Sequence, residues 1–124
     1  MSSATGELDP SESRGMERSA ALSIPASVRF TRRELDRILN LYGRMVADGE
    51  WRDYAIDYLR DRAVFSVFRR ASEVPLFQIV KDPKLARRQG AFAVIAAGGR
   101  ILKRGQELGR VLGVFDGKLK VVEA

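Results

Sequence analysis

Residues Phe30–Val46, FTRRELDRILNLYGRMV, carry the signals of a helix start followed by one apolar stripe. Thr31 can cap the helix N-terminus, and Glu34 stands three residues later, which completes a capping box. Phe30 and Leu35 occupy the flanking positions of a hydrophobic staple. The apolar stripe consists of Leu35, Ile38, Leu39, Tyr42, Met45 and Val46. These signals together predict a long amphipathic helix that packs on another layer.

The sequence after Trp51 changes to a two-residue alternation that favours a β-strand, with Tyr54, Ile56 and Tyr58 on one face. The same aromatic residues also fit a helical stripe, so residues 51–59 stay open between strand and helix. Four further segments are rich in β-branched and aromatic residues and predict strands: 63–70, 76–81, 91–97 and 101–104.

Turn signals connect these segments. The Gly98-Gly99 pair is typical of a two-residue hairpin turn, because glycine adopts positive φ without steric cost. Residues 106–112 place Leu108, Val111 and Leu112 at helical spacing and predict a short helix. Asp116-Gly117 then predicts a terminal hairpin between Val114-Phe115 and residues 119–122.

These elements predict the α+β class. One long N-terminal helix would pack on an antiparallel sheet of about five or six strands, with a short C-terminal helix added, because the connections are too short for parallel crossovers. Residues 1–26 are rich in Ser, Gly, Glu, Ala and Pro and predict a disordered tail. We expect residues 27–124 to form a single domain.

The chain of 124 residues contains neither histidine nor cysteine. A histidine general base, a Ser-His-Asp triad, a His- or Cys-ligated metal, a thiol nucleophile and a disulfide are therefore excluded. We expect no cofactor and no metal site, and we assign no catalytic residue. An enzyme would have to use Asp53, Asp57 or Glu73 with arginines and tyrosines, and the interpretation leans away from that class.

The net charge of +6 favours an anionic partner, either nucleic acid or an acidic protein surface. Guanidinium groups form bidentate contacts with phosphate and carboxylate, so surface cations are the candidate binding residues. They are Arg60, Arg62, Arg69, Arg70, Arg87, Arg88, Arg100, Lys103 and Arg104. An up-and-down connectivity would place Arg60 and Arg62 at the opposite end of their hairpin from Arg69 and Arg70. A continuous basic patch therefore does not follow from the sequence.

Two aromatic features have both a functional and a structural interpretation. Trp51, Arg52, Asp53 and Tyr54 could line a ligand pocket, or the aromatic side chains could simply pack in or beside the core. The phenylalanines of the predicted strands could stack the bases of a single strand, or could fill the core. No nucleic-acid-binding signature accompanies them.

A second functional class remains open, a protein–protein adapter or homodimer in which charge serves only solubility. The apolar runs are far too short to cross a membrane, so no membrane association is expected. Acidic residues near the N-terminus, Glu7, Asp9 and Glu12, do not fit a secretory signal, and we expect a cytoplasmic protein.

Three blocks of the sequence resemble a family of small bacterial proteins known only as a domain of unknown function. The blocks are LYGRMVADGEWRDYAID at 41–57, FSVFRRASEVPLFQI at 65–79 and GRILKRG at 99–105. The resemblance covers roughly residues 28–124 and leaves out the N-terminal segment. It implies a bacterial cytoplasmic protein with one intact domain, and it assigns no activity, cofactor or functional residue.

Overall fold

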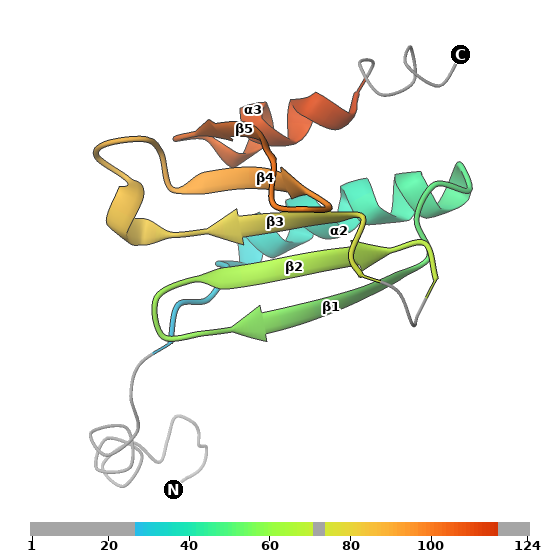
Figure 1. The fold of residues 1–124 in the computed structure, drawn as a ribbon, viewed down its shortest axis with the longest axis horizontal. Helices are drawn as coiled ribbons and strands as arrows, with labels where there is room; N and C mark the ends of the chain where they lie inside the picture. The colour runs from blue at the N-terminus through green and yellow to red at the C-terminus, as the bar shows by residue number, and fades with distance from the viewer. Residues whose placement is uncertain (1–26, 71–73, 117–124) are drawn as a thin grey trace, which may run out of the picture.

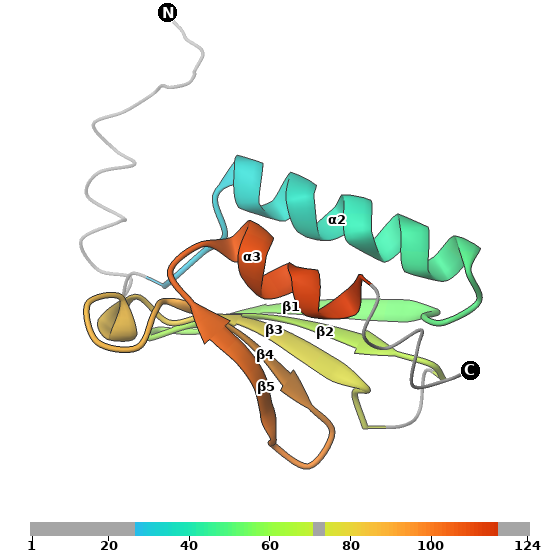
Figure 2. The same ribbon diagram turned by 90° about the horizontal axis from the view of Figure 1, so that it is seen from above.

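The computed structural model describes residues 27–70 and 74–116 of the chain. In these ranges the chain forms two α-helices and a five-stranded antiparallel sheet, which confirms the α+β prediction (Figure 1). Figure 2 shows that both helices lie on the same face of the sheet. The predicted N-terminal tail and the end of the predicted terminal hairpin lie outside the described residues.

The long helix α2, Arg32–Ala47, begins as predicted. The Thr31 hydroxyl accepts a hydrogen bond from the Glu34 amide at 3.1 Å, and the Glu34 carboxylate accepts one from the Thr31 amide at 2.8 Å. The predicted stripe needs two corrections, because Val46 is 39% exposed and Leu41 is buried. Leu41 lies on the side of α2 that faces the second helix. The buried face of α2 therefore packs against both the sheet and that helix.

The sheet is a simple meander in the order β1-β2-β3-β4-β5. Its strands are β1 Asp53–Tyr58, β2 Ala63–Phe68, β3 Phe77–Lys81, β4 Phe92–Ala96 and β5 Ile101–Gly105. The open alternative for residues 51–59 is settled as a strand, since Asp53–Tyr58 pairs residue by residue with β2. The meander places the β1–β2 and β3–β4 connections at one end of the sheet and the other two connections at the opposite end (Figure 1).

The short helix α3, Leu108–Leu112, lies over β4 and β5 and beside α2. Its three predicted apolar residues are all buried. The predicted strand at Val114-Phe115 is wrong, because the 3-10 helix η2, Gly113–Phe115, continues directly from α3. Phe115 keeps the helical spacing of Val111 and Leu112 and packs its ring against Trp51 and Phe77, at centroid distances of 5.1 and 5.0 Å. Tertiary packing therefore overrides the strand prediction for Val114-Phe115, and the second half of the predicted hairpin lies outside the described residues.

The core lies between the helices and the sheet. Phe65 and Ile79 are fully buried at its centre, beneath Ile38 of α2. The β3–β4 connection contains a second 3-10 helix, η1 Pro83–Leu85, whose first turn is capped by the Asp82 carboxylate. It returns to the sheet at Gly90, which has a φ of 104° and is buried against β5.

Candidate functional site

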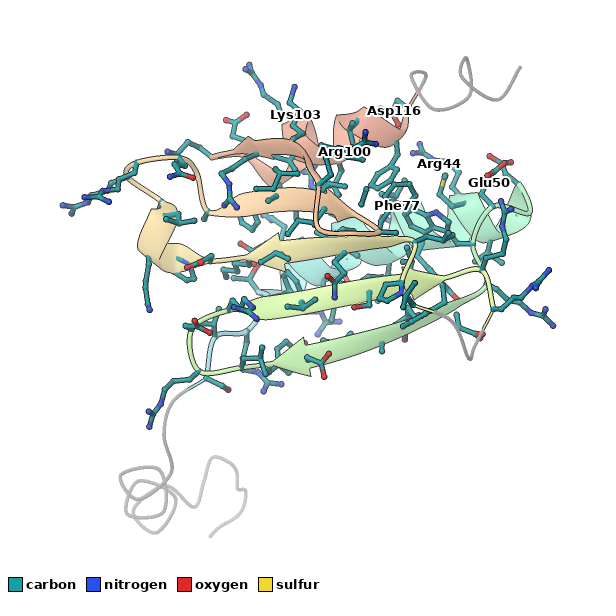
Figure 3. All side chains as sticks on the ribbon, viewed as in Figure 1. Arg44, Glu50, Phe77, Arg100, Lys103 and Asp116 are labelled. Atoms are coloured by element: carbon teal, nitrogen blue, oxygen red, sulfur yellow. The ribbon has the colours of Figure 1, made fainter. Side chains whose placement is uncertain are left out.

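The meander divides the predicted basic residues between the two ends of the sheet. Arg60 and Arg62 in the β1–β2 connection lie at the same end as Arg87 and Arg88 in the β3–β4 connection (Figure 1). Arg69, Arg70 and Arg100 lie at the opposite end, and Lys103 and Arg104 lie on β5. Figure 3 shows the Lys103 side chain pointing outward from the β5 edge. The nine residues therefore do not form one continuous patch.

The end that carries the β1–β2 and β3–β4 connections is called the basic end here. Its exposed cations are Arg60, Arg62, Lys84, Arg87 and Arg88. Arg62 has a distant carboxylate partner, Asp61, at 3.9 Å. Within the described residues, the other four have no carboxylate at ion-pair distance. These exposed cations can attract polyanions through long-range charge.

The predicted aromatic pocket is only partly formed. A shallow hollow of about 580 Å³ is lined by Trp51 and Arg52 together with Val46, Gly49 and Arg69. Trp51 is itself buried, with its ring against Phe77 and Phe115, so it presents little surface to a ligand. Arg69 is already paired with Glu50 at 3.6 Å.

Asp53 and Tyr54 lie outside that hollow, on opposite faces of β1. Tyr54 stacks on Phe65 on the helix side, at a centroid distance of 4.9 Å. Tyr42 of α2 packs edge-on against Tyr54 and donates a hydrogen bond to the Arg52 carbonyl at 2.6 Å. Burial, with smaller contributions from Asp53 and Tyr54, raises the pKa of Tyr42 above its usual value of 10.0.

The carboxylate pair considered for catalysis is also separated. Asp53 and Asp57 lie on the same face of β1, and four residues of strand put them about 13 Å apart. That separation is too long for a glycosidase-type acid and base pair. Glu73 lies outside the described residues.

The structure brings together a different set of arginines, which the sequence analysis did not single out. Arg33, Arg37, Asn40 and Arg44 recur at intervals of four, three and four residues, so they share one face of α2. They line a groove between α2 and α3 that consists of two neighbouring hollows of about 310 and 400 Å³, which share Arg37 and Gly109. The groove is called the α2–α3 groove here, and the three arginines are called the arginine stripe.

Small and apolar residues form the floor of the α2–α3 groove. Leu41 and Leu112 line one part, and Phe92 and Leu108 line the other. Gly109 belongs to both parts, and a Cβ atom at Gly109 would lie 2.7 Å from the Arg37 guanidinium. The absence of a side chain at Gly109 thus allows the Arg37 guanidinium to lie against α3.

The groove is lined by three arginines and three carboxylates, and each of the carboxylates already has a cationic partner. Arg44 forms an ion pair with Asp116 at 3.1 Å, and Figure 3 shows these two residues close together at one end of the molecule. Glu107 at the other end pairs with Arg110, and Glu34 pairs with Lys81. In the part of the chain that the structure describes, neither Arg33 nor Arg37 has a carboxylate within ion-pair distance. Two of the three arginines are therefore available to an anionic ligand.

A signal for this groove exists in the sequence, although a weak one. The spacing of Arg33, Arg37 and Arg44 indicates a shared helix face, and Gly109 and Gly113 indicate a helix with one bare side. Neither pattern states that the two helices lie side by side. That arrangement depends on α3 returning over β4 and β5, which only the tertiary structure reveals.

The phenylalanines do not form a stacking platform. Phe65 and Phe92 are buried under the helices, and Phe77 packs on Trp51 and Phe115. Phe68 is the exception, since the register of β2 puts its side chain on the opposite face from Phe65 and Val67. The structural interpretation of these rings is therefore confirmed for three of the four.

Among residues 27–70 and 74–116, no group of three or more acidic side chains is placed to hold a metal ion. No helix in those ranges is long and apolar enough to cross a membrane.

Comparison with known protein families identifies the family of the chain. A model described as "Protein of unknown function (DUF2794)" matches residues 28–112. The chain belongs to the DUF2794 family. The match covers both helices and all five strands, and it confirms the resemblance inferred from the sequence blocks. No curated protein and no solved structure matches the chain significantly. Membership in DUF2794 assigns no role to any residue, so the function has to be argued from the α2–α3 groove itself.

Proposed function

We propose that the protein is a binding module that recognises an acidic polypeptide segment through the α2–α3 groove. The observation that carries this proposal is the arginine stripe beside a hollow with a glycine and leucine floor. The guanidinium group keeps its charge at any physiological pH and offers a planar set of donors that matches a carboxylate.

A carboxylate already occupies one position of the stripe. The Asp116 side chain accepts a hydrogen bond from Arg44 at 3.1 Å, and both side chains are well exposed. This intramolecular pair shows the kind of contact that Arg33 and Arg37 can make with another chain. It is weak enough, as an exposed pair, to be exchanged for an external carboxylate.

The spacing of the stripe suits an extended peptide. Arg33 and Arg37 are separated by four helical residues, a rise of about 6 Å. Side chains at alternate positions of an extended peptide lie on one face about 7 Å apart. A peptide with glutamate at alternate positions can therefore present one carboxylate to each of the two arginines.

The exposed groups of the groove favour a polypeptide over a nucleic acid. Leu41, Leu108 and Leu112 are at most 6% exposed, so a ligand would contact mainly the arginines, Asn40 and the bare side of α3 at Gly109. Sequence-tolerant binding of a nucleic acid strand relies on exposed aromatic rings, and three of the four strand phenylalanines are unavailable for stacking. Nucleic acid is accordingly the second candidate, with the basic end as its site.

The direct test measures binding of two fluorescently labelled probes by anisotropy. One probe is a peptide with glutamate at alternate positions, and the other is a single-stranded DNA of equal charge. Arg37→Glu should weaken peptide binding at least about tenfold, because it replaces an attraction by a repulsion inside the groove. Arg88→Glu is the matched control, since it makes the same change of net charge at the basic end. Arg88→Glu should weaken peptide binding by less than about threefold.

Arg37→Lys sharpens the test, because lysine keeps the charge and loses the planar fork. We expect an intermediate loss of affinity for the peptide. Equal losses for Arg37→Glu and Arg88→Glu would mean that net charge alone drives binding, and would contradict a role for the groove. Tighter binding of the DNA, with Arg88→Glu as the more damaging change, would favour the second candidate. A cytoplasmic location is consistent with either partner and remains a prediction.

A further inference from the structure

Strand β1 forms one edge of the sheet, and no other described strand pairs with its outer side (Figure 1). Exposed sheet edges can pair with another chain, and natural proteins usually protect them with bulges and lysines. The opposite edge, β5, has both features: a register shift beside Val94 and Ile95, and the outward side chain of Lys103 (Figure 3). Strand β1 has neither, since its six residues, Asp53–Tyr58, pair with β2 in an unbroken register. The β1 edge is therefore open to an added strand.

The backbone hydrogen bonds of β1 alternate between its inner and outer sides. The Leu59 amide donates a hydrogen bond to the Arg62 carbonyl at 2.8 Å and closes the β1–β2 hairpin. In an antiparallel ladder, hydrogen-bonded pairs recur at every second residue. Counting back from Leu59, the residues that bond to β2 are therefore Asp57, Ala55 and Asp53. The amide and carbonyl groups of Tyr54 and Ile56 point outward, and they have no backbone partner in the part of the chain that the structure describes.

The side chains of β1 give the two faces of this edge different characters. On the helix side, Tyr54 is 44% exposed and Ile56 is partly buried, so an added strand would meet apolar surface there. On the face of the sheet that carries neither helix, Asp53, Ala55 and Asp57 are all exposed (Figure 2). Among residues 27–70 and 74–116, no cation lies within ion-pair distance of either aspartate. The charges of β1 are thus two unpaired carboxylates, although the whole chain has a net charge of +6.

We infer that the outer edge of β1 binds an extended basic peptide as a sixth, antiparallel strand, a mode of recognition in which main-chain hydrogen bonds supply affinity. The peptide exchanges hydrogen bonds with Tyr54 and Ile56. Its residues opposite Asp53 and Asp57 occupy non-hydrogen-bonded positions, where facing side chains lie closest. Lysine or arginine at these two positions, four residues apart, pairs with both carboxylates. Apolar residues opposite Tyr54 and Ile56 cover the exposed ring, which gives the pattern basic, apolar, any, apolar, basic.

Charge distinguishes this occupant from two others. If β1 paired with β1 of a second copy, four aspartates would share one face of the joined sheet, and like charges across strands are destabilising. An acidic peptide would meet the same repulsion at Asp53 and Asp57. The β1 edge and the α2–α3 groove therefore select peptides of opposite charge, and the β1 site goes beyond the function proposed for the groove.

The first experiment measures binding of three labelled peptides to the full chain by fluorescence anisotropy, up to about 500 µM protein. Their central sequences are KVTVK, EVTVE and KKVTV. KVTVK should bind at least about tenfold more tightly than EVTVE, because the glutamates replace two attractions by two repulsions. KKVTV has the composition and charge of KVTVK, but only one of its lysines can face an aspartate. We expect KKVTV to bind at least about threefold more weakly than KVTVK.

A charge swap tests the two aspartates directly. Asp53→Lys combined with Asp57→Lys should reverse the preference, so that EVTVE binds more tightly than KVTVK. Asp36→Lys combined with Asp48→Lys is the matched control, because it makes the same change of net charge at exposed positions on α2 and directly after it. The control should keep the preference for KVTVK. Thermal melts check that both double variants fold.

Amide hydrogen exchange identifies strand addition, because electrostatic contact alone leaves backbone amides open to water. With KVTVK bound, the Tyr54 and Ile56 amides should exchange at least about tenfold more slowly. The Ala55 and Asp57 amides already bond to β2 and should change much less. Protection at every second residue is therefore the expected signature of a sixth strand.

Four results would each overturn the inference. They are no binding of KVTVK, binding that leaves the Tyr54 and Ile56 amides unprotected, a preference for KVTVK that survives the charge swap, and protection of the same amides by self-association without peptide. The β1 edge contributes no residue to the α2–α3 groove, so failure of either proposal leaves the other standing.

Discussion

Substitution of Gly90 tests the geometry of the β3–β4 connection, because a side chain at this position would cause both backbone strain and a steric clash. Its φ of 104° lies in the region that side chains disfavour. A Cβ atom at this position would also lie 2.3 Å from the carbonyl carbon of Gly105, which belongs to the backbone of β5 and cannot move aside cheaply. Gly90→Ala therefore combines backbone strain of about 1–2 kcal/mol with overpacking of about 1–3 kcal/mol. We expect a loss of about 2–5 kcal/mol in the free energy of unfolding.

Two other glycines separate these penalties. Gly99 has a φ of 91° and no atom within 4 Å of a Cβ, so Gly99→Ala should cost only the backbone strain. Gly113 has a negative φ and equally open space, so Gly113→Ala should be neutral or stabilising. Urea denaturation of the three variants should rank them Gly90, Gly99 and Gly113 in decreasing order of damage. A Gly90→Ala variant that loses no more stability than Gly99→Ala would refute the close approach of the β3–β4 connection to β5.

Further predictions concern α2 and its contacts. Thr31→Ala should lower the free energy of unfolding by about 1 kcal/mol, measured by urea denaturation, because the Glu34 amide loses its capping acceptor. Glu34→Gln keeps an acceptor for the capping box but removes the ionic partner of Lys81 at 2.8 Å; the loss in the same assay should be about 1–3 kcal/mol, since both side chains are mostly buried. Tyr42 has a raised pKa in the folded state, so its contribution to stability is fully present below pH 10.0 and is lost as the pH rises through the folded pKa. Urea denaturation at increasing pH should therefore show a steeper alkaline loss for the unmodified chain than for Tyr42→Phe, and equal slopes would contradict the burial of this hydroxyl.

Local signals were sufficient for most elements of this fold. The capping box at Thr31 and Glu34 depends on residues three apart, and the structure contains both of its hydrogen bonds. The Gly98-Gly99 turn is equally local, and both glycines have the positive φ that the sequence prediction required. Such features are predictable because their causes lie within one turn of chain.

Features that depend on distant contacts were missed. The sequence pattern predicts a strand at Phe115, yet its ring completes a cluster with Trp51 and Phe77 that only the folded chain assembles. The apolar stripe does not include Leu41, because the burial of Leu41 depends on the neighbouring helix α3. The α2–α3 groove also depends on the packing of the two helices and is therefore not predictable from the sequence. The arginine stripe lines a groove only when Gly109 lies beside Arg37.

The central functional claim is that an acidic polypeptide binds between α2 and α3. The most direct measurement is a titration of the isotopically labelled chain with the glutamate peptide, followed by amide chemical shifts in nuclear magnetic resonance. We expect the largest shifts at Arg37, Gly109 and Gly113, with little change in the loop at 84–88. Shifts confined to that loop, or spread evenly over all exposed arginines, would contradict it.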